Sequence, residues 1–276
     1  MELLPSLLST LRTVDPGTLD QEYSVVRSQT SVLKRDLSLT TEAGALKENI
    51  KKNRYKDILP YDQSRVVLSL LTSDCDSDYI NASFIKGASA DNRYIASQGP
   101  LSSTLIDFWR MIWEHDVKVI VMACREIEMG KKKCECYWSS VHQSASFGPF
   151  TVCNQGETRP NEDLVVRNLT VSYQQQIICD LITLCPFIFY IHSVAGCGRT
   201  GVICALDYIH NLLVTKQITL DFSIMKIVLE LRRQRPSAVQ TKDQYQFIFT
   251  AVACMFERFL QTTHSRLYLP EVKTHF

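Results

Sequence analysis

The sequence of 276 residues has almost no net charge, and it lacks features that define several classes of protein. Its formal net charge is only +1, so we expect no overall attraction to nucleic acid or to an acidic membrane surface. We find no internal repeats and no low-complexity tract, which argues against repeat proteins and disordered chains. Any anion-binding site must therefore be a local feature.

A long uninterrupted hydrophobic run is also missing. The longest apolar stretch, residues 177–191, is broken by Asp180, Thr183 and Pro186. It is also shorter than the ~20 residues that a membrane-spanning helix needs, so we interpret it as a buried strand with its approach. The first residues have no basic segment before an apolar one. We therefore expect no signal peptide, no membrane span and a cytoplasmic location.

The ten cysteines do not form a recognisable metal-binding or disulfide pattern. They are scattered and lie mostly inside apolar runs, and reduced cytosolic thiols explain this better than disulfides do. Cys134 and Cys136 are too close together for a C-x2-C pair, and no matching pair of histidines or cysteines follows them. We therefore predict no metal and no cofactor.

The remaining composition is that of a globular protein, with 45% hydrophobic and 21% charged residues. Thr104 and Asp107 form an S/T-x-x-D/E helix start, and Thr241 is placed to cap the last helix. Periodicity predicts strands at 78–85, 94–98, 117–123 and 187–192, and helices at 19–27, 105–113, 201–213, 224–233 and 241–259. The strand at 117–123 is expected to be buried on both faces. Strands that alternate with helices predict an α/β fold with a central twisted mixed sheet flanked by helices.

The chain is expected to form one domain with short extensions. Residues 1–48 are polar and mixed, and we interpret them as a lead-in segment that packs on the domain. Residues 49–262 contain the periodic elements and are assigned to the domain itself, while residues 263–276 form a short tail. A domain of this size buries a substantial core.

The most informative stretch is residues 189–201, with the sequence FYIHSVAGCGRTG. A buried strand runs directly into a loop containing Gly196, Gly198 and Gly201, and a helix follows. Glycines allow such a loop to curl so that successive backbone N–H groups surround an anion, and the start of the helix adds partial positive charge. Arg199 has a planar guanidinium that can hold two oxygens of a phosphate. The residues themselves thus predict a phosphate site.

The same loop also matches the dinucleotide-binding pattern G-x-G-x-x-G at residues 196–201. That fold requires a second strand soon after the helix, ending in an acidic residue. Another helix is predicted at 224–233 instead. We therefore favour the phosphate site over a dinucleotide site.

The stretch HSVAGCGRTG resembles the protein tyrosine phosphatase signature H-C-S-A-G-x-G-R-[ST]-G. Residues 123–134 and the Gly-Cys-Gly of the loop resemble the PEST-type subgroup of the non-receptor phosphatases. The resemblance covers about residues 49–260 and implies the fold of that family, phosphotyrosine proteins as partners and a monomer. Further segments resemble the family's motifs in the family's order: KNRYKDILP (52–60), DYINASFI (78–85), YIASQGP (94–100), DFWRMIW (107–113), VIVMA (119–123), KCECYW (133–138) and QRPSAVQTKDQY (234–245).

The resemblance also implies roles for individual residues. Tyr55 would stack on the substrate ring and set the depth of the pocket, and Asp57 would hold backbone amides of the substrate. Gln240 and Gln244 match residues that position the hydrolytic water. The implied substrate- and phosphate-binding set, with Glu128 and Lys133 as supporting residues, is Tyr55, Lys56, Asp57, His192, Val194, Ala195, Gly196, Cys197, Gly198, Arg199, Thr200, Gly201, Gln240 and Gln244.

The chain departs from the family at the nucleophile. The family has a cysteine six residues before the loop arginine, where this chain has Ser193. Loop amides and the helix end lower the pKa of that cysteine in the family, whereas a serine hydroxyl has no comparable anionic form. The family's histidine, here His192, orders the loop and does not take a proton from the nucleophile. We expect phosphotyrosine to bind but the attack to fail, and we expect Cys197 to be a packed thiol.

The second departure is the absence of Trp-Pro-Asp, whose aspartate is the family's general acid and contributes typically ~10²–10⁴-fold. The interval between residues 174 and 192 is shorter than in the family by roughly thirty to forty residues, so a strand–loop–helix segment is predicted to be missing. Asp180 lies in this interval without the Trp-Pro context, and we do not assign it the acid role. We expect a severely impaired phosphatase and attribute residues 177–194 to a splice variant or a retained intron end. The alternatives are a phosphotyrosine-binding pseudophosphatase and an inactive product that folds poorly.

Overall fold

The centre of the computed structural model, which describes residues 3–74, 76–89, 92–174, 176–178 and 189–267, is a five-stranded sheet. Its strand order is β1-β2-β3-β11-β4. Strand β11 is parallel to β3 and β4, whereas β2 is antiparallel to β1 and β3, so the predicted mixed sheet is confirmed. The strands are β1 (Arg65–Val67), β2 (Tyr79–Lys86), β3 (Asn92–Gln98), β4 (Val119–Met122) and β11 (Phe189–Ser193).

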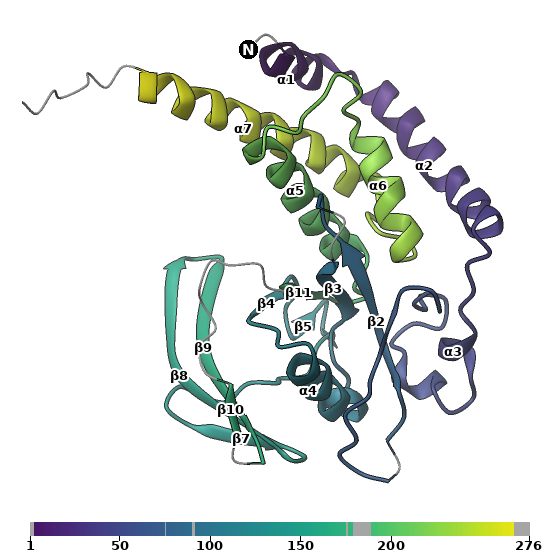
Figure 1. The fold of residues 1–276 in the computed structure, drawn as a ribbon, viewed down its shortest axis with the longest axis vertical. Coiled ribbons are helices and arrows are strands. Elements are labelled where there is room, and N and C mark those ends of the chain that lie inside the picture. The colour runs from purple at the N-terminus through teal and green to yellow at the C-terminus, as the bar shows by residue number, and fades with distance from the viewer. Residues whose placement is uncertain (1–2, 75, 90–91, 175, 179–188, 268–276) are drawn as a thin grey trace, which may run out of the picture.

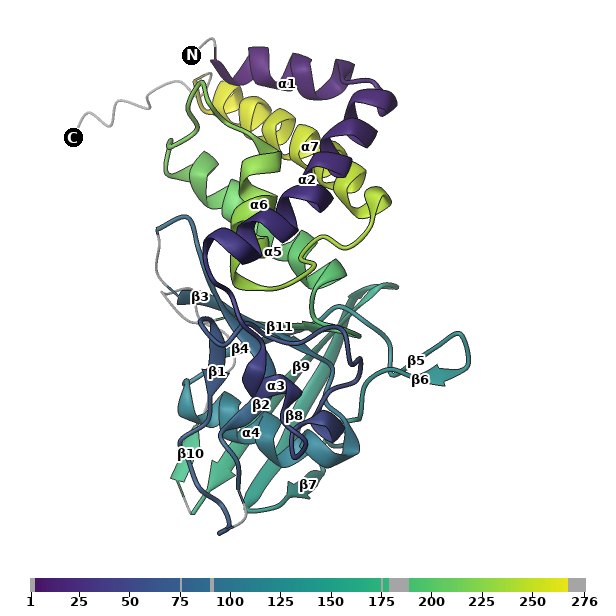
Figure 2. The same ribbon diagram turned by 90° about the vertical axis from the view of Figure 1, so that its right-hand side faces the viewer.

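Helices cover the sheet, as predicted. Helices α1, α2, α5, α6 and α7 gather on one side of the sheet, as Figures 1 and 2 show, while α4 lies on the other. All five predicted helices are present, and the one predicted at residues 19–27 is much longer than expected. The helices are α1 (Leu3–Thr13), α2 (Pro16–Asp36), α3 (Glu42–Ala45), α4 (Leu105–Glu114), α5 (Gly198–Val214), α6 (Ile224–Gln234) and α7 (Lys242–Leu267), with 3-10 turns η1 (Ile50–Lys52) and η2 (Ser102–Thr104).

The sheet separates two hydrophobic cores. Successive side chains of a strand point to opposite faces, so neighbouring residues of β3 and β11 enter different cores. Tyr94 and Ile191 pack in the core made with α2, α5, α6 and α7. Ile95 and Tyr190 pack in the core made with α4 and the second sheet. Strands β3 and β11 are therefore buried on both faces.

A second, antiparallel sheet with the order β10-β9-β8-β7 was not predicted. Its inner end packs on the core through Phe150, Val152, Leu169 and Val171. Its outer end is exposed and polar around Glu157 to Asn161, which weakens the strand signal in the sequence. The strands of this sheet and of a small hairpin are β7 (Ser144–Phe147), β8 (Phe150–Asn161), β9 (Leu164–Tyr173) and β10 (Gln176–Ile178), with β5 (Ile127–Glu128) and β6 (Lys131–Lys132) in the hairpin.

Two local predictions were wrong. Strand β4 is half-buried at every position rather than buried on both faces, because it lies at the edge of the five-stranded sheet. Helix α4 begins where expected, but Thr104 and Asp107 do not cap it. The Thr104 hydroxyl accepts from the Leu101 amide at 2.9 Å, and Asp107 forms ion pairs elsewhere. By contrast, Thr241 accepts from the Gln244 amide at 3.2 Å, so the predicted cap of α7 is confirmed.

The first two helices pack on α6 and α7, as expected for a lead-in segment. Tyr23 and Val26 of α2 are buried, and the Thr30 hydroxyl accepts from Arg232 at 2.9 Å. The domain boundaries at residues 48 and 262 stay predictions. The predicted loss of a segment also stays a prediction, because residues 179–188, including Asp180, lie outside the described residues. None of the helices in the described ranges is long and apolar enough to cross a membrane.

Candidate phosphate-binding site

The predicted loop lies at the edge of the sheet where three parallel strands end. Strand β3 ends at Gln98, β4 at Met122 and β11 at Ser193. In α/β sheets, ligands bind outside the carboxyl ends of parallel strands, because the connecting loops meet there. Residues 194–197 form the loop, and α5 begins at Gly198. The strand–loop–helix arrangement predicted from the sequence is therefore present.

Two of the loop glycines are required by close backbone packing. Gly196 has a φ of +67°, and a Cβ atom there would lie 2.1 Å from the carbonyl carbon of Ser97. A Cβ at Gly201 would lie 2.5 Å from the amide nitrogen of Val239. Neither contact can be relieved by rotating a side chain, because the neighbouring atoms belong to the backbone. Glycine at these positions lets the loop curl tightly above the sheet.

The curl leaves backbone N–H groups available to an anion. Within the described part of the chain, the amides of Val194, Ala195 and Cys197 have no acceptor. The Gly196 amide donates to the hydroxyl oxygen of Ser193 at 3.2 Å. The start of α5 contributes the further free amides of a helix N-terminus and its partial positive charge. This backbone arrangement suits a phosphate.

Arg235 supports the loop from behind and was missed by the sequence analysis. Its side chain is 1% exposed, and it donates to the carbonyl oxygens of Gly196 and Ala195 at 3.0 and 3.1 Å. Since the carbonyl and N–H of a trans peptide point in opposite directions, these bonds turn the next amides away from Arg235 and toward the anion. Burial lowers the pKa of Arg235, although the bonds to Asn81 and Ser83 also hold its guanidinium. In the sequence Arg235 lies after a helix and before a proline, and nothing in that local context indicates its distant partners.

Glu128, predicted as a supporting residue, forms an ion pair with Arg199. Both Nη atoms of Arg199 donate to the Glu128 carboxylate, at 2.5 and 3.1 Å, and Nη1 also donates to the Ala123 carbonyl at 3.2 Å. The hydrogen bond to Arg199 lowers the pKa of Glu128 and raises that of Arg199. A guanidinium has five N–H donors, and these bonds use both donors of Nη1 and one donor of Nη2. The remaining two donors, Nε–H and the second Nη2–H, share one edge and have no partner among the described residues. That edge can hold two phosphate oxygens.

Ser193 lies under the loop, where two hydrogen-bond donors hold its hydroxyl. Its side chain is 4% exposed, and its oxygen accepts from the Thr200 hydroxyl at 3.0 Å as well as from Gly196. The neighbouring His192 directs Nε2 toward the Tyr137 hydroxyl at 3.0 Å instead. No hydrogen bond links Ser193 to a basic side chain in the described part of the structure.

One cavity of about 400 Å³ unites most of the predicted site. It brings residues 52–60, the recognition segment, together with the loop and Arg199, although these residues are distant in the sequence. Ile58 and Met129 also line it and were not predicted. The lining residues are Tyr55, Asp57, Ile58, Glu128, Met129, Lys133, Ser193, Val194, Ala195, Gly198, Arg199, Gln240 and Gln244.

Some predicted residues do not line this cavity. Lys56 is exposed and lies beside a different hollow with Gly44 and Ala45, so the motif identified the segment but not the side chain that faces the pocket. His192 is fully buried. The other predicted residues outside the cavity line a small space behind the loop: Gly196, Cys197, Thr200 and Gly201. Cys197 is fully buried and its pKa is raised by that burial, which confirms the prediction of a packed thiol.

The segment with Tyr55 is fixed to the same edge of the sheet. Gln98, at the end of β3, accepts from the Arg54 amide at 2.9 Å and donates to the Lys52 carbonyl at 2.8 Å. The Tyr55 hydroxyl accepts from Lys133 at 3.3 Å. These bonds hold the Tyr55 ring at the wall of the cavity.

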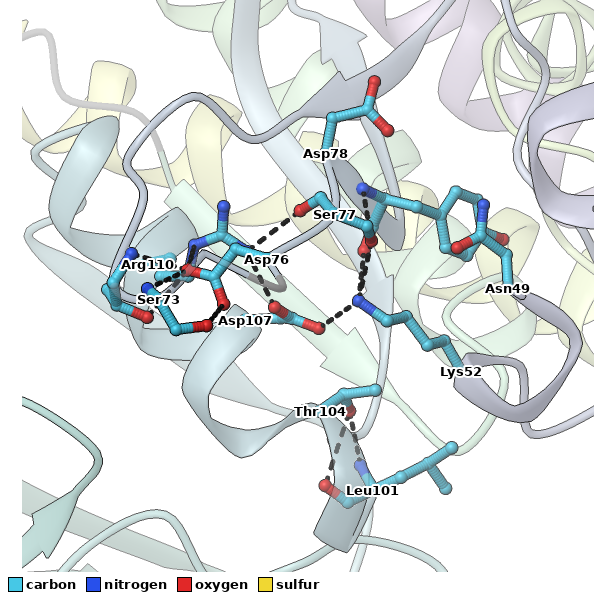
Figure 3. A network of polar contacts seen from close by, with 12 residues as sticks. Asn49, Lys52, Ser73, Asp76, Ser77, Asp78, Leu101, Thr104, Asp107 and Arg110 are labelled. Atoms are coloured by element: carbon cyan, nitrogen blue, oxygen red, sulfur yellow. Dashed lines mark hydrogen bonds and ion pairs between the residues drawn. The ribbon is translucent and has the colours of Figure 1, made fainter.

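A buried polar network anchors this segment from the other side (Figure 3). Lys52 donates to Asp107 and to the Ser77 hydroxyl, both at 2.8 Å. Asp107 also accepts from Arg110 at 2.8 Å, and the Arg110 side chain is fully buried. A carboxylate oxygen of Asp76 lies 3.7 Å from Nε of Arg110. Burial alone would raise the pKa of Asp76, but hydrogen bonds from Thr72 and Ser73 outweigh burial and lower this pKa strongly. The network joins α4 to the start of the recognition segment.

The sequence and the structure both match known proteins. Residues 49–179 and 188–254 match the family model described as protein-tyrosine phosphatase. The chain is 40% identical to tyrosine-protein phosphatase non-receptor type 18 of Mus musculus, covering 95% of this chain and 65% of the relative. It is 45% identical to non-receptor type 12 of Homo sapiens, covering 80% of this chain and 32% of the relative. The chain thus spans less than two thirds of the length of these relatives.

Solved structures of non-receptor type 18 share the fold. The catalytic domain of human non-receptor type 18 superposes with a TM-score of 0.85 at 42% identity, covering 90% of this chain and 99% of that one. PTPN18 in complex with HER2 phosphopeptides gives a TM-score of 0.83 at 44% identity, covering 87% of this chain and 93% of that one.

Proposed function

Because the chain belongs to the protein-tyrosine phosphatase family, we propose that its pocket binds phosphotyrosine but hydrolyses it only very slowly. The observation that carries this proposal is the shared cavity of Tyr55 and Arg199. A phosphotyrosine ring stacked on Tyr55 would direct its phosphate to the free amides of the loop and the free edge of the guanidinium. Only a long phosphorylated side chain would reach the bottom of such a pocket.

The proposed loss of hydrolysis rests on Ser193. Its hydroxyl accepts two hydrogen bonds, which would suit an anion, but a serine is not ionised near neutral pH. No basic side chain among the described residues forms a hydrogen bond with it. The family's acid motif Trp-Pro-Asp is also absent from the sequence. Loss of the nucleophile and of the acid affects two separate steps, so we expect turnover to fall by several orders of magnitude.

Further parts of the proposal follow from the family. We place the chain in the PEST-type subgroup, in the cytoplasm and as a monomer, with residues 49–262 as the phosphatase-like domain, residues 1–48 as its lead-in segment and residues 263–276 as its tail. PTPN18 has been solved with HER2 phosphopeptides, which supports phosphotyrosine peptides as the partners of this chain. Glu128 and Lys133 would support the bound phosphate, and Gln240 and Gln244 would position a water.

The segment before Ser193 is proposed to be a splice variant or a retained intron end. The family match is interrupted between residues 179 and 188, and the half-buried edge strand β4 agrees with a missing neighbour. Transcript sequencing across codons 174–196 tests this idea. A read that joins His-Cys-Ser-Ala to a Trp-Pro-Asp exon would support it, whereas an uninterrupted read of the present segment would refute it.

The proposed function is tested by two measurements on the same preparation. We expect negligible hydrolysis of p-nitrophenyl phosphate, and turnover at the rate of an ordinary phosphatase would refute the impairment. We also expect a phosphotyrosine peptide to bind and vanadate to displace it. The variant Arg199→Ala should weaken this binding by roughly 10²-fold, because the phosphate would lose a two-pronged charged partner.

The binding measurement also separates the alternatives. A pseudophosphatase binds the peptide in a vanadate-sensitive way without turnover. A product that folds poorly shows neither binding nor a cooperative thermal transition. We favour the first outcome because Arg235 supports the loop through a buried hydrogen bond, and residues 52–60 are bonded to the end of β3 beside it.

A further inference from the structure

Two cysteines and a histidine meet beneath the phosphate loop, although they lie on separate segments. Cys124 follows β4, Cys134 follows β6, and His192 belongs to β11. Their sulfur atoms and a ring nitrogen of the histidine all lie within 4.8 Å of one another. Cys134 and His192 are fully buried, while Cys124 is half-buried. None of the three lines the cavity of the phosphate-binding site.

The histidine has an unused nitrogen. His192 Nε2 is paired with the Tyr137 hydroxyl at 3.0 Å, whereas Nδ1 is buried with no hydrogen-bond partner in the described part of the chain. Buried polar atoms of native proteins are almost always satisfied, so this ring nitrogen of a fully buried histidine requires an explanation. The Cys124 thiol is only a weak hydrogen-bond partner for the histidine. A metal ion supplies a stronger partner, because a neutral imidazole with one N–H engaged offers its other nitrogen as a ligand.

We propose that Cys124, Cys134 and His192 bind one zinc ion. Two thiolates and an imidazole are ligands that zinc prefers, with bonds of about 2.3 Å to sulfur and about 2.0 Å to nitrogen. In a tetrahedral site the sulfurs lie about 3.8 Å apart, so the groups need to approach only slightly. On binding, each thiol loses its proton to solvent, and the two thiolates balance the charge of the ion.

The surroundings fit such a site. Tyr137 holds the outer nitrogen of His192, as the outer partners of metal-bound histidines commonly do. Cys124 is half-buried, so a water can occupy the fourth position from that side and the ion has a route in. The proposal departs from the prediction of no metal, because the ligands come from three segments and form no C-x2-C pattern.

The ion would join the two ends of the segment that carries Glu128. This segment leaves the sheet at Cys124, forms the β5–β6 hairpin and returns at Cys134. Glu128 of the hairpin pairs with Arg199, and His192 precedes Ser193. A zinc ion between the segment ends and β11 would therefore hold Glu128 in position to pair with Arg199. This inference does not depend on whether the pocket binds phosphotyrosine.

The test is a titration of the purified full chain, kept reduced, with Zn²⁺ in competition with a chromophoric chelator. We expect one ion per chain and a higher melting temperature in its presence. The variants Cys124→Ser and Cys134→Ser should each weaken binding more than tenfold, and Tyr137→Phe by about tenfold. The matched control is Cys136→Ser, an exposed cysteine two residues from Cys134, which should bind zinc like the parent chain.

Co²⁺ provides a second measurement that does not depend on the variants. Bound to the parent chain, it should show thiolate-to-metal charge-transfer absorption with the intensity of two sulfur ligands, and this absorption should halve in Cys124→Ser. A buried substitution at Cys134 can prevent folding, but the half-buried Cys124 and the spectrum of the parent chain keep the test decisive. Absence of the absorption, or equal zinc binding by Cys124→Ser and Cys136→Ser, would overturn the proposal.

Discussion

The pocket has a wall, formed by Tyr55, and a floor, formed by the loop of residues 194–197 with Arg199 and Ser193. Substrate recognition depends on many groups of both parts, whereas the reaction depends on one atom of the floor. The wall holds Tyr55 through several independent bonds, to the end of β3, to Lys133 and through Lys52 to the buried network of α4. The floor holds a phosphate site made mostly of backbone, supported by Arg235. Chemistry on the floor, however, depends on the single side-chain atom that Ser193 provides.

Recognition and reaction are therefore separable in this fold. Recognition is spread over backbone amides and over side chains from distant segments, so it tolerates the loss of one of them. The reaction needs an ionised nucleophile, and the loop can stabilise a thiolate but cannot ionise a serine. The Ser193 hydroxyl oxygen accepts from Gly196 and Thr200, and the same two donors would stabilise a thiolate at this position.

The largest expected effect comes from Ser193→Cys. The loop amides and the end of α5 should favour a thiolate at this position, so hydrolysis of p-nitrophenyl phosphate should rise by at least about 10²-fold. The p-nitrophenolate leaving group of this substrate departs without a proton, so the missing general acid should slow its hydrolysis only slightly. A phosphotyrosine peptide should gain less, because its tyrosine oxygen needs the acid that typically contributes ~10²–10⁴-fold.

The control for this gain is Ser140→Cys, which adds a thiol at an exposed position outside the pocket. Steady-state rates of the two variants on both substrates measure the effect. If Ser193→Cys were no faster than Ser140→Cys, the floor would not stabilise a thiolate, and the contrast between the wall and the floor would fail.

The sequence predicted the floor better than the wall. The loop could be predicted because its requirements are local: a buried strand, glycines at fixed spacing and an arginine at the start of a helix. Arg235 was missed because its partners at Ala195 and Asn81 are far away in the sequence. Lys56 was assigned to the pocket because a motif defines a segment, whereas the turn decides which of its side chains point inward.

The next effect concerns the anchor of the wall. Arg110→Leu removes a fully buried cation and leaves Asp107 and Asp76 with less compensation, so it should lower the free energy of unfolding by about 3–5 kcal/mol. Arg233→Leu, which breaks an exposed pair with Glu230, should cost about 1 kcal/mol or less. Urea denaturation of both variants measures the difference. Equal losses would show that the buried network does not hold the wall more firmly than a surface pair.

A smaller effect is expected from the aromatic ring itself. Tyr55→Ala should weaken phosphotyrosine peptide binding by about tenfold, because a stacked ring contributes on the order of 1 kcal/mol beyond its buried area. Tyr55→Phe keeps the ring and loses only the hydroxyl that accepts from Lys133, so its affinity should change little. Vanadate has no aromatic ring to stack on Tyr55, so it should bind both variants like the parent chain. If vanadate affinity fell together with peptide affinity, the wall and the floor could not be treated as separate parts.

The smallest effect is the pH dependence of the pair between Glu128 and Arg199. The hydrogen bond to Arg199 lowers the folded-state pKa of Glu128 below its ordinary value of 4.5. The pair therefore stabilises the fold fully above pH 4.5, and this contribution is lost as the pH falls through the folded-state pKa. Since the Arg199 side chain is 50% exposed, we expect less than about 1 kcal/mol. Other carboxylates, such as Asp76, also destabilise the fold in acid when they become protonated, so the informative quantity is the difference from Glu128→Gln. The difference in the free energy of unfolding between the parent chain and Glu128→Gln is measured by urea denaturation from about pH 6 to about pH 3, and it should shrink toward zero as the pH falls. A constant difference would mean that Glu128 stabilises the floor through its shape and not through its charge.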